Sequence, residues 1–252
     1  RKDNESPIWT YDCGSECYFT GVALSDDGKY IAAGTGWSGD KLYLFNNSSN
    51  TPIWTYSAGE DIYQVAVSSN ADYIVAGGYD KIHVLSRDSS TPLWTASCGS
   101  QCKGRVDISA DGKYIVLGGT ASHVINFYSR DSSDNLWSYD LGNGNEVWSV
   151  SISADGEYIV AGSGDKKVYL FDKDSGTPLW SYTTSGDVRA VSISADGEYI
   201  VAGGHDDKVY LFDKDSSTPL WSYALDESVF SIDISADGKY IIAGSDDTGS
   251  YF

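Results

Sequence analysis

The sequence has no methionine, only three histidines and five prolines among its 252 residues, and basic residues are scarce beside acidic ones. Lysine and arginine total 17 against 36 aspartate and glutamate residues, so the formal net charge is −19. The basic residues are scattered along the chain, and no basic patch is available to neutralise the phosphates of a nucleic acid. No apolar run approaches the roughly 18 residues that a membrane-spanning helix requires. We therefore expect neither nucleic acid binding nor insertion into a membrane.

The lack of methionine also bears on the origin of the chain. Because the sequence opens with Arg1, it does not begin at a translational start. We expect a processed mature protein or a trimmed chain, and the first of these implies export.

Two phrases recur in step along the chain. The hexapeptide TPLWSY begins at Thr177 and again at Thr218, and close variants begin at Ser6, Thr51, Thr91 and Asp134. The second phrase, of which SADGEYIVAG is typical, begins at Ser25, Ser68, Ser109, Ser153, Ser194 and Ser235. The spacing of about 42 residues is typical of propeller repeats. Because the repeats leave no linker, we predict one domain over residues 1–252.

One unit, residues 188–225, predicts four strands. Val191 and Ile193 alternate with small polar residues, as in a strand with two different faces. Asp196 and Gly197 predict a tight hairpin turn, because both residues tolerate the positive φ of the primed turns. Residues 199–202, 208–212 and 219–223 predict three further strands, and no helical period occurs. Each unit is therefore a four-stranded antiparallel sheet that cannot bury both faces alone.

Six such sheets bury one another's faces when they surround an axis, so we predict an all-β, six-bladed β-propeller with four-stranded antiparallel blades. The chain ends inside a third strand at residues 250–252, and residues 1–11 supply the missing fourth strand. We expect this N-terminal strand to pair with the last blade and close the ring. The tryptophans of the outer strands should pack between blades rather than form six sugar-stacking sites: Trp9, Trp54, Trp94, Trp137, Trp180 and Trp221.

The repeat resembles two known families. The run from S-x-DG through a strand and an Asp-containing turn to VYLFD resembles the WD40 repeat, with Phe171-Asp172 and Phe212-Asp213 in place of the Trp-Asp pair. The outer strand PLWSY resembles instead the repeats of pyrroloquinoline-quinone dehydrogenases, which carry tryptophan there. The ring disulfide of adjacent cysteines and the calcium residues of those enzymes are not recognisable. Both resemblances imply a propeller, and neither implies one function, because this fold hosts enzymes, lectins and scaffolds.

Residues that could hold a metal are sparse and badly spaced. We expect His83 and His123 within third strands and His205 in a turn, with no short metal-ligand spacing among them. The turn DKDSG at residues 172–176 begins like a calcium loop but lacks the remaining ligands, so we expect a structural turn. We predict no metal site, no cofactor and no catalytic group, and calcium is the one cofactor left open.

The four cysteines form two CxxxC doublets, Cys13 with Cys17 and Cys98 with Cys102. Half of a metal site, a redox pair and a short disulfide are the alternatives for such a doublet. In a propeller both doublets lie between the outer strand of one blade and the inner strand of the next, in blades that are not adjacent. Two local disulfides fit best, because a turn brings residues four apart within the required Cα distance. Disulfides indicate an oxidising compartment and hence an extracellular or cell-surface protein.

Positions that vary among the six copies are not held by the fold. They lie at the start of the inner strands and in the turns between second and third strands, which a propeller gathers at one mouth of its channel. The candidates for ligand binding are Trp37, Tyr63, Tyr79, Arg105, Trp148, Arg189, His205 and Phe230. Aromatic and arginine side chains anchor interfaces, and aromatic planes also stack on sugars. Some of them could instead plug the channel.

We therefore expect a non-catalytic extracellular or cell-surface propeller that acts as a binding or assembly module. Its ligand at the channel mouth would be a protein or a glycan, and self-assembly through other surfaces is a further alternative. The alternative from another functional class is an enzyme that processes a quinone or a sugar at the channel mouth. A convergent acidic cluster with bound calcium would favour the enzyme, and an uninterrupted rim of aromatic and arginine residues would favour binding.

Overall fold

The computed structural model describes residues 6–15, 17–37, 39–99, 101–121, 123–142 and 144–246. Over these ranges all regular elements are strands, and no helix is long and apolar enough to cross a membrane. The strands form five four-stranded antiparallel sheets and one two-stranded sheet, each in simple sequence order. We call the sheets blades 1 to 6, and we call the first and fourth strand of a blade its inner and outer strand.

The strand bounds repeat from blade to blade. Blade 1 holds β1 (Tyr18–Leu24), β2 (Tyr30–Gly36), β3 (Lys41–Asn46) and β4 (Pro52–Ser57), and blade 2 holds β5 (Ile62–Val67), β6 (Tyr73–Gly78), β7 (Lys81–Ser86) and β8 (Trp94–Ser97). Blade 3 holds β9 (Arg105–Ile108), β10 (Tyr114–Gly118), β11 (Val124–Ser129) and β12 (Asn135–Asp140), and blade 4 holds β13 (Val147–Ile152), β14 (Tyr158–Ser163), β15 (Lys167–Asp172) and β16 (Trp180–Thr183). Blade 5 holds β17 (Val188–Ile193), β18 (Tyr199–Gly204), β19 (Lys208–Asp213) and β20 (Trp221–Ala224), and blade 6 holds β21 (Ser228–Ile234) and β22 (Ile241–Asp246).

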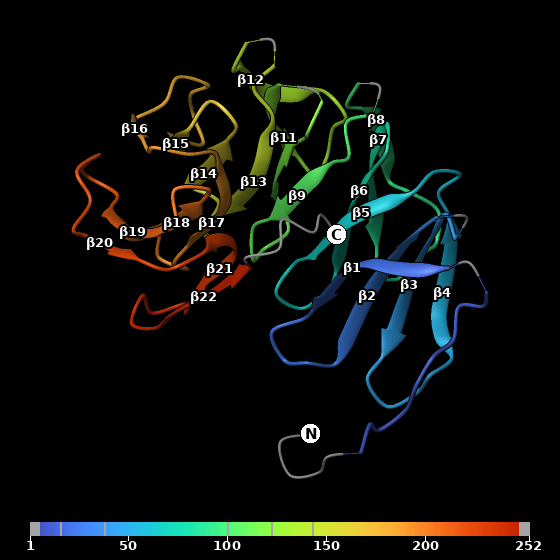
Figure 1. Ribbon diagram of the computed structural model, residues 1–252. Coiled ribbons are helices and arrows are strands. Elements are labelled where there is room, and N and C mark those ends of the chain that lie inside the picture. The colour runs from blue at the N-terminus through green and yellow to red at the C-terminus, as the bar shows by residue number, and fades with distance from the viewer. Residues whose placement is uncertain are drawn as a thin grey trace.

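The inner strands lie side by side in the order β1, β5, β9, β13, β17 and β21, so that the blades follow one another around a central space (Figure 1). The repeated four-stranded sheets confirm the predicted blades. The outer strands of blades 4 and 5 begin at Trp180 and Trp221, later than the predicted start at proline, and His123 lies just before β11 rather than within it.

The seam between blade 6 and blade 1 is open in this structure. Val22 and Leu24 of β1 are 58% and 57% exposed, whereas Val191 and Ile193 at the same places in blade 5 are 5% and 7% exposed. On the other side, Ile242 of β22 is 70% exposed. Residues 6–11 form no strand. The remaining parts of the predicted closure, residues 1–5 and 250–252, lie outside the described residues.

The outer-strand tryptophans of blades 1 to 4 join each blade to the next one. The indole nitrogens of Trp54, Trp94, Trp137 and Trp180 donate to backbone carbonyls in the following blade at 2.5 to 3.0 Å. Trp137 also stacks between Phe127 of its own blade and Phe171 of the next, with centroid distances of 5.0 and 5.3 Å. These contacts confirm that the tryptophan is a packing residue and explain why the phrase TPLWSY is repeated.

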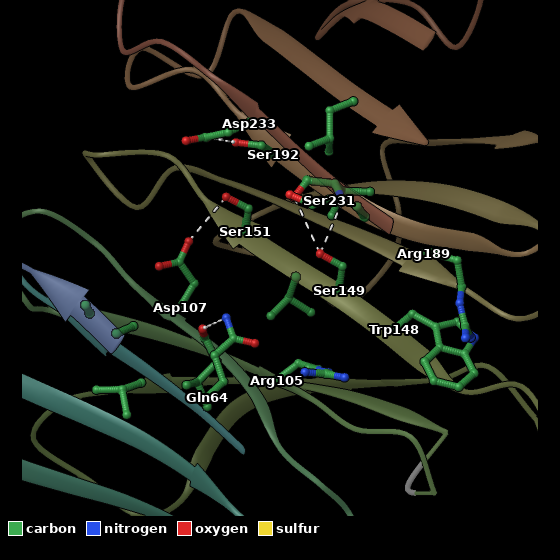
Figure 2. Close-up of a pocket in the computed structure, with 18 of the residues that line it drawn as sticks. Gln64, Arg105, Asp107, Trp148, Ser149, Ser151, Arg189, Ser192, Ser231 and Asp233 are labelled. Carbon is green, nitrogen blue, oxygen red and sulfur yellow. Dashed lines mark hydrogen bonds between the residues drawn. The ribbon is translucent and has the colours of Figure 1, made fainter. Parts of the chain in front are cut away.

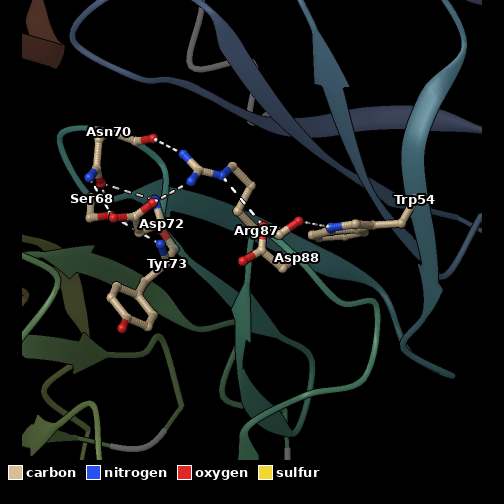
Figure 3. A network of polar contacts seen from close by, with 7 residues as sticks. All are labelled: Trp54, Ser68, Asn70, Asp72, Tyr73, Arg87 and Asp88. Carbon is tan, nitrogen blue, oxygen red and sulfur yellow. Dashed lines mark hydrogen bonds and ion pairs between the residues drawn. The ribbon is translucent and has the colours of Figure 1, made fainter.

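The S-x-DG phrase forms a four-residue turn reinforced by side chains, not the two-residue primed turn predicted from Asp196 and Gly197. Ser194 and Tyr199 close the turn, because the Ser194 hydroxyl accepts the Tyr199 amide at 3.0 Å and donates to Asp196 at 2.6 Å. Four residues therefore separate the closing pair, and only Gly197 takes a positive φ, of 73°. Backbone bonds close the same turn, since the Ser194 amide donates to the Tyr199 carbonyl and the Gly197 amide donates to the Ser194 carbonyl, both at 2.9 Å. The serine hydroxyl and the aspartate carboxylate add to these bonds. Figure 3 shows the variant turn of blade 2, with Trp54 of the preceding blade bonded beside it.

The glycine that ends the phrase YIVAG lets neighbouring blades meet. A Cβ atom at Gly162 would lie 2.7 Å from the Val188 side chain, and one at Gly203 would lie 2.6 Å from Val229. Both contacts are far shorter than a Cβ atom tolerates, so these positions require glycine for the close approach of one blade to the next.

Candidate functional site

Four of the eight candidate residues occupy one repeated irregularity of the inner strands. In β1, β5, β13, β17 and β21 the register with the second strand skips one residue: Thr20, Tyr63, Trp148, Arg189 and Phe230. A bulge of this kind leaves its residue outside the ladder and re-aims the side chain. The rim positions vary among the copies because sheet pairing places no demand on them.

Four of the eight candidates line one cavity of about 510 Å³ in the central space (Figure 2). They are Arg105, Trp148, Arg189 and Phe230. The Arg189 guanidinium lies over the Trp148 ring, 3.5 Å from its centroid, and 5.8 Å from the centroid of Phe230. At this distance the ring holds the cation by cation–π attraction and fixes its orientation.

The other four candidates lie in smaller groups around the mouth. Tyr63 and Tyr79 stack on each other at 6.3 Å, and the His205 ring meets the edge of Phe230 at 5.5 Å. Trp37 stands apart from the cavity on blade 1, where it is 70% exposed and contacts Tyr18 at 6.0 Å. The predicted rim is therefore not one continuous aromatic surface.

The cavity also contains two aspartates that the sequence reasoning missed, Asp107 and Asp233. Asp107 accepts hydrogen bonds from the Ile152 amide at 3.0 Å and the Ser151 hydroxyl at 3.2 Å. Burial, more than the nearby Asp233, raises the pKa of Asp107 to about 6. A signal for both was present, because the same position of the other inner strands holds only alanine or serine. Figure 2 shows that the aspartates and the arginines lie at different ends of the cavity.

Two hydrogen-bond donors at the arginine end have no partner within the described residues. They are Nε of Arg105 and the indole nitrogen Nε1 of Trp148, both shielded from solvent. Burial, together with the charge of Arg189, lowers the pKa of Arg105. Buried donors without acceptors are rare in folded proteins and call for a water, an ion or a ligand.

The histidines do not form a metal site within the described ranges, where no group of three or more His, Cys, Asp or Glu side chains is suitably placed. His83 is buried in β7, bonded through one ring nitrogen to Glu60 at 2.7 Å and through the other to Tyr56 at 3.1 Å. Burial lowers the pKa of His83. This arrangement satisfies both ring nitrogens, and His83 therefore packs as a core residue.

The turn DKDSG bonds to its own backbone. The Asp174 amide donates to the Asp172 carboxylate at 2.9 Å, and the Thr177 amide donates to the Ser175 hydroxyl at 3.0 Å. These bonds are typical of a structural turn, as the sequence predicted.

Both predicted disulfides are present, Cys13–Cys17 and Cys98–Cys102, each with a Cα separation of 5.8 Å. They lie in the loops that lead into β1 and β9, on the same face as the channel mouth. Cys98 and Cys102 also belong to the hydrophobic core between blades 2 and 3. The second disulfide thus helps to fix the loop that immediately precedes Arg105.

A comparison with known protein families finds a match over nearly the whole chain. The family described as outer membrane protein assembly factor BamB matches residues 3–156, 38–195 and 122–249. The chain belongs to this family. The match confirms the resemblance of the outer strand to quinone-dehydrogenase-type propeller repeats rather than to WD40 alone. No curated protein matches the chain.

Proposed function

We propose that this protein is a non-catalytic, exported binding module: one closed propeller domain that receives a protein partner at its channel mouth. The observation that carries the proposal is the set of bulges, which aim different large side chains at one mouth of a repeated scaffold. Arginine and aromatic side chains concentrated in this way are typical of protein interfaces. Membership of a family named for an assembly factor favours a protein partner over a glycan.

Closure of the ring is supported by two series of contacts that stop at the seam. In the S-x-DG turns, backbone amides donate to the next blade at 2.8 to 3.1 Å, through Asp26, Ser69, Ala110, Ala154, Ala195 and Ala236 in turn. A sixth link, from the Ala236 amide to the Asp26 carbonyl, would complete the circle. Trp9 already donates to the Asn47 carbonyl at 2.7 Å, as the outer-strand tryptophans do to the blade that follows theirs. This contact supports the assignment of the N-terminal segment as the outer strand of blade 6 in the closed ring.

Closure would also remove the exposed apolar side chains at the seam. Val22, Leu24 and Ile242 are each more than half exposed, and their counterparts in blades 3 to 5 are buried. Burying such a side chain fully contributes about 1.5 to 3 kcal/mol. Covering three half-exposed side chains would stabilise the closed ring by about 3 kcal/mol.

An extracellular or cell-surface location is supported by the two disulfides, which persist in oxidising compartments. The family name adds an association with the outer membrane.

An enzyme acting on a quinone or a sugar is the alternative from another class. Asp107 is the observation that favours it, because a carboxylic acid with a pKa raised to about 6 can exchange a proton near neutral pH. The Asp107 carboxylate accepts hydrogen bonds from the Ile152 amide and the Ser151 hydroxyl. A structural role of Asp107, linking blades 3 and 4, is enough to explain these bonds.

Photo-crosslinking in cells that export the protein tests the binding face. Benzoylphenylalanine would replace Trp37 or Tyr79 at the mouth, and Asp88, whose side chain is 91% exposed on the opposite face, would be the matched control. We expect a discrete protein adduct from the mouth positions and none from position 88. An adduct consisting of a second copy of this chain would support self-assembly instead. Equal adducts from both faces, or none from the mouth, would contradict the proposal.

A further inference from the structure

The arginine end of the cavity brings together two cations from different blades. Arg105 begins β9 in blade 3, and Arg189 occupies the bulge of β17 in blade 5, with Trp148 of blade 4 between them (Figure 2). Their charges are close enough for Arg189 to lower the pKa of Arg105. Like charges held together in a partly enclosed site destabilise each other unless an anion lies between them.

Arg105, which lines the cavity, has no carboxylate partner among the described residues, whereas the arginines outside the cavity do. Arg87 pairs with Asp72 at 2.8 Å (Figure 3), and Arg130 pairs with Asp131 at 3.0 Å. Among the described residues, no carboxylate lies within ion-pair distance of Arg105, although the chain has 36 acidic residues for 17 basic ones. The carboxylates at the mouth serve other partners: Asp61 accepts the Trp37 amide at 2.7 Å, and Asp187 lies 3.7 Å from His205.

The donors at this end are of the kinds that bind a carboxylate. Arg189 is held against Trp148 at 3.5 Å, while Nε of Arg105 and Nε1 of Trp148 lack acceptors within the described part of the chain. A guanidinium binds a carboxylate through parallel N–H bonds, and such charge-assisted bonds are stronger than neutral ones. Lys103, 5.9 Å from the centroid of Tyr63, adds a further cation at the mouth.

The aromatic rings at the mouth already support side chains of the protein itself. Trp148 makes a cation–π contact with Arg189, Tyr63 stacks on Tyr79, and Phe230 makes an edge contact with His205. Recognition of the ligand therefore falls to the charged donors rather than to open aromatic planes of the kind on which sugars stack. Asp107 and Asp233, at the other end of the cavity, would keep an anionic ligand at the mouth.

We propose that Arg105 and Arg189, with the indole nitrogen of Trp148, bind a carboxylate of the partner, so that the channel mouth recognises an acidic protein segment. This inference rests on the proposed binding function. It names the chemistry of the partner: a peptide with glutamate or aspartate side chains.

The test is an NMR titration that observes the donors directly. The probes are a short glutamate peptide with blocked ends, its glutamine counterpart and glucuronate, each added to ¹⁵N-labelled protein. The glutamate peptide should shift the resonances of the Trp148 indole and the Arg105 Nε–H. The indoles of Trp54, Trp94, Trp137 and Trp180 already donate to carbonyls, so they should not move, and they report whether each variant is folded.

The variants Arg105→Gln and Arg189→Gln should each weaken binding of the glutamate peptide by about tenfold or more, which corresponds to about 1.4 kcal/mol. Arg130→Gln, which removes an arginine paired with Asp131 outside the cavity, is the matched control and should bind like the wild type. Arg189→Lys keeps the charge but loses the planar fork, and we expect an intermediate loss.

Three results would overturn the inference. The glutamine peptide could shift the same resonances equally, the arginine variants could bind as the wild type does, or glucuronate could bind as tightly as the peptide and so assign the site to acidic sugars. The photo-crosslinks separate this failure from failure of the proposed function. Mouth adducts that persist in Arg105→Gln and Arg189→Gln would keep the binding face and reject the acidic partner, whereas absence of mouth adducts would reject the binding face.

Discussion

Replacing Trp180 by alanine should weaken the protein far more than the same change at Trp221, although both residues stand in the hexapeptide TPLWSY. Trp180 is half-buried, its ring lies 5.3 Å from Phe212 of the next blade, and its indole nitrogen donates to the Lys214 carbonyl at 2.8 Å. Trp221 is 41% exposed and precedes blade 6, of which the described residues form two strands. The pair therefore compares one sequence in two structural settings.

The magnitude follows from what each change removes. Emptying a buried tryptophan costs about 3 to 5 kcal/mol, and a single hydrogen bond contributes about 1 kcal/mol. Because Trp180 is only half-buried, we expect Trp180→Ala to lower the free energy of unfolding by about 3 kcal/mol, its hydrogen bond included. Trp180→Phe should cost about 1 kcal/mol, since the ring remains and the bond to Lys214 is lost. Trp221→Ala should cost about 1 kcal/mol or less.

Urea denaturation followed by tryptophan fluorescence and far-UV circular dichroism measures these differences. A loss below about 0.5 kcal/mol for Trp180→Ala would refute the packing role of the outer-strand tryptophan, since surface substitutions commonly fall in that range. Equal losses at Trp180 and Trp221 would show that both tryptophans are packed alike, and the difference described between blades 5 and 6 would then be wrong.

Three further predictions concern the turns, the cavity and the seam. Ser194→Ala should lower the free energy of unfolding by about 1 to 2 kcal/mol, because the Tyr199 amide loses a side-chain acceptor. In the same denaturation assay, the control Ser222→Ala on exposed β20 should change the free energy of unfolding by less than about 0.5 kcal/mol. Because the folded-state pKa of Asp107 is raised to about 6, the folded form holds a proton that the unfolded chain has released, so stability should fall as pH rises through about 4 to 6. Asp107→Asn should remove this fall, which amounts to about 3 kcal/mol, and parallel stability curves for the two proteins would contradict the assignment. If the ring closes, cysteines introduced at positions 26 and 236 should form an intramolecular disulfide. The control pair at positions 26 and 195 should not crosslink. A disulfide-linked dimer would show that the seam closes between two copies instead.

The blades could be predicted because their determinants are local and repeated. The alternation in β17, the serine-closed turn and the tryptophan of β16 each act within a few residues or on the adjacent blade, and each occurs in most copies. A single weak signal would be ambiguous, but the same signal at a fixed spacing identifies the unit. The glycine of YIVAG belongs to the same set, since its place follows from blade contact.

The features that escaped the sequence depend on backbone irregularity or on distant neighbours. A bulge requires no particular residue type, so Trp148 and Arg189 were recognisable as variable positions but not as residues outside the ladder. His123 was misplaced because it takes a φ of 51° just before β11, in a turn that departs from the other copies. The gathering of Asp107, Asp233 and Arg189 around one cavity depends on the inner strands of several blades at once, and no local pattern encodes it.

The most direct test of the central claim is hydrogen–deuterium exchange on the complex with the partner captured by photo-crosslinking. The account predicts slower exchange in the turns at residues 78–81 and 204–208 on the mouth face, with unchanged exchange in the S-x-DG turns at 153–158 and 194–199 on the opposite face. Protection of the S-x-DG turns with no change at the mouth would contradict the account and assign binding to the other face of the propeller.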